Sequence, residues 1–145
     1  MLAELEKSTI PLVPSCRLMQ RLADPRVFDI LSDLAAAVGR EGGEIEVICG
    51  YRSTWSNDFL RERSSGVAKK SLHMQAHAID IRISGVDTLT LRNAALALGR
   101  GGVGYYPRSG FVHVDTGRRS SPRSVATLNL SCCSWTARAI TYTCW

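Results

Sequence analysis

The chain has 145 residues, which suits one compact domain with a single hydrophobic core. Its 45% hydrophobic and 21% charged residues are ordinary for a globular protein, and no apolar run is long enough to span a bilayer. Four arginines and no acid in residues 116–145 account for most of the net charge of +5, so the rest is nearly neutral and no nucleic-acid partner is expected.

The two ends of the chain differ from its centre. Pro11 and Pro14 favour an irregular lead-in over residues 1–23, and the first residues lack the pattern of a secretory signal. Residues 118–145 are rich in Ser, Thr, Cys and Arg, which predicts a disordered tail or, alternatively, a non-native terminus. The folded domain is therefore expected over residues 24–117.

The first half of this domain predicts helix, strand, helix. Asp24 and Pro25 are typical of a helix cap and first turn, and glycines from position 39 onward end the helix. Its apolar residues recur at helical spacing: Val27, Ile30, Leu31, Leu34 and Val38. Residues 44–49 predict a strand and residues 54–63 a short helix.

The second half predicts a strand, a helix and a hairpin. Residues 78–83 alternate, with the isoleucines on one face and Asp80 and Arg82 on the other. Asp87 can cap the next helix, and residues 104–106 and 111–115 form two short strands around a turn. The fold class is predicted as α+β, with a small, mostly antiparallel sheet, helices packed on one side and a cleft on the exposed sheet face.

The five cysteines contain no CxxC pair, so neither a zinc finger nor a disulfide framework is indicated. Cys49 lies in an apolar strand and is interpreted as a core residue.

Three residues form a candidate metal site. His73 precedes a strand, Asp80 lies within that strand, and His113 lies in a later strand. Two imidazoles and a carboxylate suit zinc and leave a fourth position for water, as a catalytic site requires. Spacing alone leaves other uses open: surface or core histidines, and an ion pair of Asp80 with Arg52 or Arg82.

Three motifs in order decide between these readings: GYRS, SLHMQAHAID and GGVGYYPRSGFVHVDTG. Together they resemble the zinc peptidoglycan peptidases, which include murein endopeptidases and D-Ala-D-Ala carboxypeptidases and have a hedgehog-type zinc fold. The resemblance implies one zinc ion per chain held by His73, Asp80 and His113. It implies hydrolysis of peptide bonds in peptidoglycan cross-links, with Arg52 binding substrate or stabilising the oxyanion.

The remaining site residues are assigned more loosely. Asp115 shares a strand face with His113 and is predicted to be the general base or to orient a ligand histidine. Ser71 and Tyr106 are expected to shape the substrate-binding cleft. Two positions depart from the family pattern: Ala76 stands where glycine is usual, and Gly110 stands where relatives often place an acid or histidine.

The resemblance also implies a setting. Peptidoglycan peptide is the expected substrate and the periplasm or cell envelope the expected location, although no signal peptide is visible. A monomer without a membrane span is expected. The alternative is a catalytically weak or inactive zinc-binding domain that binds cell-wall peptide or a protein partner.

Overall fold

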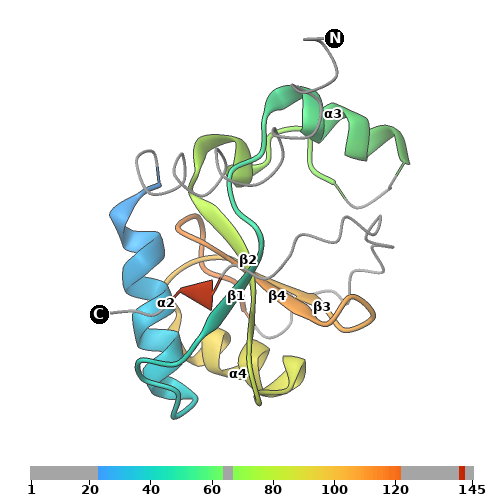
Figure 1. Cartoon of the computed structure of the whole chain (residues 1–145). Coiled ribbons are helices and arrows are strands. Elements are labelled where there is room, and N and C mark those ends of the chain that lie inside the picture. Colours follow the sequence, from blue (N-terminus) through green and yellow to red (C-terminus); the bar gives the residue numbers. More distant parts are fainter. Residues whose placement is uncertain (1–22, 64–66, 122–140, 143–145) are drawn as a thin grey trace, which may run out of the picture.

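The computed structural model describes residues 23–63, 67–121 and 141–142. Figure 1 shows a sheet with helices against it, so the α+β prediction is confirmed. The elements in chain order are α2 (Pro25–Ala37), β1 (Ile45–Cys49), α3 (Thr54–Arg63), the 3-10 turn η1 (Leu72–Gln75), β2 (Ala78–Ile83), α4 (Thr88–Leu98), β3 (Val103–Tyr106), β4 (Phe111–Asp115) and β5 (Thr141–Tyr142).

Two helices begin at the predicted caps. The Asp24 carboxylate accepts a hydrogen bond from the Arg26 amide at the start of α2. The Asp87 carboxylate accepts from the amides of Leu89 and Thr90 at the start of α4. Each cap satisfies amides that have no partner within the helix, which fixes where the helix begins.

The sheet has the strand order β3-β4-β2-β1-β5, and all its pairs are antiparallel. β2 therefore lies at the centre, between β4 and β1. Its isoleucines, Ile79, Ile81 and Ile83, are buried in one cluster with residues of α2 and α4. Because side chains alternate along a strand, Asp80 and Arg82 point to the opposite face of the sheet, away from this helical layer.

Replacing Ile81 with alanine should lower the free energy of unfolding by about 2–5 kcal/mol, because its side chain is fully buried at the centre of the core. Leu89→Ala is the matched control: its side chain is 46% exposed on α4, so a change within about 0.5 kcal/mol is expected. Denaturant unfolding of both variants measures the difference. Equal losses would contradict the assignment of the core to this face.

α3 does not share in the helical layer, and its single buried residue is Asn57. The Asn57 amide donates to the carbonyl of Ala68, at 3.1 Å, and its oxygen lies 3.5 Å from the Arg52 guanidinium. Asn57 thereby connects the helix to the loops on either side of it. These contacts place Arg52 at the end of β1.

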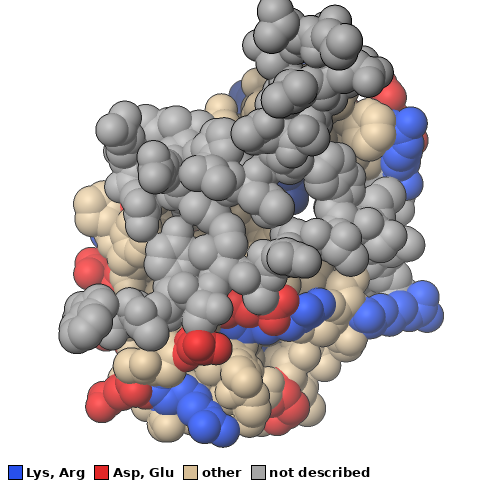
Figure 2. Space-filling view, in the orientation of Figure 1, with Lys and Arg blue, Asp and Glu red and all other residues tan. Residues whose placement is uncertain are grey.

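Charges of both signs lie close together on the described part of the face in Figure 2. The described residues contain no helix long and apolar enough to cross a membrane. The expected lead-in lies outside the described residues except for Ala23, as do residues 122–140 and 143–145 of the expected tail.

Candidate metal centre

The pairing of three strands brings Cys49, Asp80 and His113 into one row across the sheet. Asp80 lies directly opposite His113 in the β2–β4 pair. Cys49 lies opposite Asp80 in the β1–β2 pair, just after an irregularity that follows Val47. Residues directly opposite each other in antiparallel strands share a face and have neighbouring side chains. Residues 64 positions apart in the chain are thus brought to one place.

His73 reaches this row from the short 3-10 turn η1, rather than from an irregular loop. The Ser71 hydroxyl caps the turn by accepting a hydrogen bond from the His73 amide, at 3.3 Å. The turn ends at Ala76, whose backbone has φ 55 in the left-handed region. An L-residue there costs roughly 1–2 kcal/mol, which explains why glycine suits this position.

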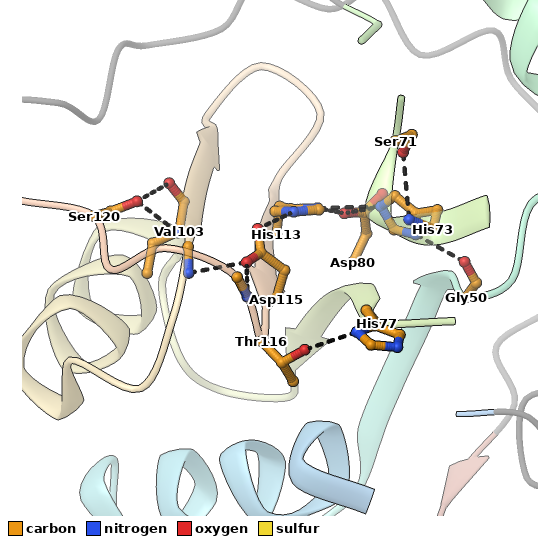
Figure 3. A network of polar contacts seen from close by, with 12 residues as sticks. Gly50, Ser71, His73, His77, Asp80, Val103, His113, Asp115, Thr116 and Ser120 are labelled. Carbon is orange, nitrogen blue, oxygen red and sulfur yellow. Dashed lines mark hydrogen bonds and ion pairs between the residues drawn. The ribbon is translucent and has the colours of Figure 1, made fainter. Parts of the chain in front are cut away.

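The three predicted ligands converge, as Figure 3 shows. Oδ1 of Asp80 lies 2.8 Å from Nδ1 of His113 and 3.2 Å from Nε2 of His73, and the two nitrogens are 3.1 Å apart. Ligand atoms of a tetrahedral site lie about 3.3 Å apart when each is about 2.0 Å from zinc. The donor set therefore has the chemistry and nearly the spacing that a zinc ion needs.

The other ring nitrogen of each histidine is also engaged. Nδ1 of His73 lies 2.7 Å from the carbonyl of Gly50, which can only accept, so this nitrogen carries the proton. Nε2 of His113 lies 3.1 Å from Oδ2 of Asp115. Because its other ring nitrogen is engaged in this way, each histidine would ligate a metal through the nitrogen that faces Asp80, which is Nε2 of His73 and Nδ1 of His113.

Asp115 is itself held in place. Its Oδ1 accepts from the amides of Gly102, at 3.0 Å, and Gly117, at 2.7 Å. A Cβ at Gly102 would collide with this carboxylate, so the glycine-rich turn permits its close approach. The sequence analysis predicts that Asp115 is either the general base or a group that orients a ligand histidine, and the structure places its carboxylate against His113 and two backbone amides.

Burial and charge act against each other at the ligands. Burial would raise the pKa of Asp80, but the charges and hydrogen bonds of His73 and His113 lower it. Burial also opposes protonation of His73, yet Asp80 raises the pKa of that imidazole well above its usual value. The pKa of His113 is raised too, because hydrogen bonds to Asp115 and Asp80 outweigh its burial. The site combines an ionised carboxylate with two strongly basic imidazoles.

Among the described residues, Cys49 is a candidate site residue that the sequence analysis missed. The interpretation as a core residue is wrong: the residue is partly buried, and its Sγ forms a potential metal-binding group with donor atoms of His73 and Asp80, all within 4.8 Å. The error arose because an apolar strand was considered without its neighbours. Pairing residues 44–49 with the strand that contains Asp80 would have placed Cys49 opposite Asp80.

Arg52 lies beside the same group. Its NH2 donates to Sγ of Cys49, at 3.3 Å, and its backbone amide donates to the carbonyl of His73, at 3.1 Å. The ion pair of Arg52 with Asp80, considered from the sequence, is not formed among the described residues, where Asp80 pairs with the two histidines. Arg82 instead pairs with Glu46 and bonds to the hairpin backbone.

Tyr106 stacks on Phe111 with ring centroids 4.5 Å apart. Burial, together with the nearby charge of Asp80, raises the pKa of Tyr106 to about 12. The phenol therefore remains a neutral hydrogen-bond donor at physiological pH.

Of the predicted site residues, the structure brings Arg52 close to the ligands. The Ser71 hydroxyl instead bonds to the backbone of its own turn.

Comparison with known proteins identifies a family and several relatives. The family Peptidase_M15_2, described as peptidoglycan L,D-endopeptidase MepK, matches residues 16–121. The probable peptidoglycan L,D-endopeptidase MepK of Haemophilus influenzae is 49% identical over 94 residues, which are 65% of this chain and 50% of the relative. The peptidoglycan L,D-endopeptidase MepK of Escherichia coli K12 is 50% identical over 94 residues, 65% of this chain and 51% of the relative.

The chain thus spans about half the length of the curated relatives it matches. No solved structure matches it with significance. The family match nevertheless covers most of the chain and includes all three motifs on which the resemblance rested, so that resemblance is confirmed. This chain belongs to the Peptidase_M15_2 family.

Proposed function

We propose that this chain is a zinc-dependent endopeptidase that hydrolyses a peptide bond between an L and a D centre in peptidoglycan cross-links. The observation that carries the proposal is the convergence of His73 Nε2, Asp80 Oδ1 and His113 Nδ1 within 3.2 Å of one another. The relatives named as peptidoglycan L,D-endopeptidases supply the substrate class.

One zinc ion held by His73, Asp80 and His113 would supply a Lewis acid and acidify its bound water. Arg52 is the cation beside the ligands, held by Asn57 and Cys49. It is assigned to the substrate, either at the developing oxyanion or at a carboxylate of the cell-wall peptide. Tyr106, neutral and beside Asp80, is assigned a hydrogen bond to the same substrate, and Ser71 shapes the loop that carries His73.

Asp115 is assigned to orienting His113 rather than to proton transfer. Burial would raise the pKa of Asp115, but the hydrogen bond and charge of His113 and the two backbone amides together outweigh burial, so the pKa is lowered. A general base works best with a pKa near the operating pH, and a carboxylate with a lowered pKa is a weak one.

Asp115→Asn should weaken zinc affinity by about 10–100-fold, as is usual when the group that orients a ligand histidine is lost. The reason is that an amide cannot match the charge that faces Nε2 of His113. Competition with a chromophoric chelator measures the affinity, and Asp33→Asn, a half-exposed carboxylate on α2, is the control. Unchanged affinity with a loss of hydrolysis of about 100-fold or more would instead identify Asp115 as the base.

The function itself is tested by incubating the zinc-loaded chain with purified cross-linked muropeptides and analysing the products by mass spectrometry. New peptide termini at an L,D bond are the expected result. Muropeptides that carry only D,D cross-links serve as the comparison substrate. If the zinc-loaded chain yields no product from any muropeptide, the enzymatic function is rejected.

The alternative function is a zinc-binding domain that binds cell-wall peptide without cleaving it. One observation favours it: Gly110, three residues before His113, has no side chain to act as a base. Saturable binding of the muropeptides without product would support this alternative. In either case, we propose that the chain acts in the cell envelope as a monomer.

A further inference from the structure

Cys49 lies beside two of the three predicted metal ligands, His73 and Asp80. The irregularity in β1 after Val47 brings Cys49 opposite Asp80 and into the row of site residues. Its Sγ and one donor atom each of His73 and Asp80 all lie within 4.8 Å of one another. Bond lengths to zinc are about 2.3 Å for sulfur and 2.0–2.2 Å for nitrogen and oxygen, so two donor atoms bound to one zinc ion lie less than 4.8 Å apart.

The surroundings of this sulfur suit a thiolate. Arg52 NH2 donates to it, at 3.3 Å, and an N–H that donates to sulfur stabilises its negative charge without occupying every lone pair. Asn57, a buried residue, lies 3.5 Å from the other arm of the same guanidinium, which holds it in place. A cysteine that only packs in the core does not require a cation beside its sulfur.

We propose that Cys49 is a fourth protein ligand of the metal, so that the resting site is closed by one sulfur, two nitrogens and one oxygen. This inference rests on the metal site of the proposed function and adds a residue to it. The thiol loses its proton to solvent when its sulfur binds the metal. Four protein ligands are typical of closed sites, whereas catalytic sites keep one position open. Water would therefore reach a bound metal only if the Cys49 sulfur had left it.

The experiment replaces zinc by cobalt, whose bond to a thiolate gives a charge-transfer absorption in the near ultraviolet. The cobalt-loaded chain should show this band, and Cys49→Ala should lack it while still binding cobalt through the other three ligands. Zinc affinity in Cys49→Ala should fall by at least about tenfold, the smaller of the losses seen when a group that merely orients a ligand is removed.

The other four cysteines provide a matched control. A variant with Cys16, Cys132, Cys133 and Cys144 all replaced by serine should keep the band and should bind zinc as the parent chain does. In this variant, zinc should slow the reaction of the one remaining thiol with a disulfide reagent. Circular dichroism verifies that both variants are folded.

Three outcomes overturn the proposal, and they can be told apart. If the parent chain binds cobalt without the band and zinc does not protect Cys49, the sulfur is not a ligand, although the three-ligand site stands. If the parent chain binds neither metal, the proposed function fails together with this inference. A band that persists in Cys49→Ala would assign the sulfur to another cysteine and also overturn the proposal.

Discussion

His113→Ala should reduce bound zinc from about one ion per chain to a small fraction of that, and muropeptide hydrolysis should fall by about 1,000-fold or more. Nδ1 of His113 faces Asp80 at 2.8 Å and His73 at 3.1 Å, so its loss removes the ligand atom closest to Asp80 and leaves two of the three predicted ligands, with the proposed Cys49 sulfur as a further donor. The metal supplies several kcal/mol of transition-state stabilisation, and each 1.36 kcal/mol, roughly, is a factor of ten in rate.

Metal analysis after dialysis measures the stoichiometry, and muropeptide turnover measures the rate. His77→Ala is the matched control, since this histidine is half-exposed and contacts Thr116 rather than the row. Its zinc content and rate should match those of the parent chain. A folded His113→Ala variant that retained both zinc and hydrolysis would contradict the proposed ligand set.

Arg52→Met should lower the rate of hydrolysis by about 100–1,000-fold, as expected for the loss of a group that stabilises an oxyanion. Methionine preserves much of the length of the side chain but removes its charge and its five donors. Zinc content should stay near that of the parent chain, because none of the three predicted ligands is changed. Steady-state kinetics with a defined muropeptide measures the effect.

The same kinetics decides between the two roles left open for Arg52. A fall in kcat at constant KM would assign the guanidinium to the oxyanion, whereas a rise in KM alone would assign it to a substrate carboxylate. Arg61→Met is the control, because Arg61 lies on α3 and pairs only loosely with Asp58, at 3.6 Å. If Arg52→Met turned over muropeptide like this control, Arg52 would have no part in the reaction.

Local sequence patterns were sufficient to predict most of the fold. The alternation of residues 78–83 predicted both the central strand and the face of the isoleucines, because burial on one face imposes a period of two. Asp24 and Asp87 predicted two helix starts for an equally local reason, since a cap bonds to amides two or three residues away. The faces of Asp80 and His113 followed from the same period.

Contacts between distant segments were beyond these patterns. No local rule pairs Cys49 with Asp80, because that pairing depends on the order of strands and on the irregularity in β1. The 3-10 turn around His73 was also missed, since its geometry depends on Ser71 as cap and on Ala76 in a left-handed conformation. Motif resemblance identified the ligands, but only strand register reveals the sulfur beside them.

The row across the sheet has a consequence for how the chain can change in length. Because side chains alternate with a period of two, inserting or deleting one residue within β2 or β4 turns a ligand toward the helical layer. A change of two residues keeps it on the correct face. His113 and Asp115 are two residues apart in β4, so they share a face even after an insertion or deletion earlier in the strand.

The turn at residues 107–110, outside the paired residues, can change in length without this restriction. Homologous chains should therefore vary freely in the turn, while length changes within these strands should come in even numbers.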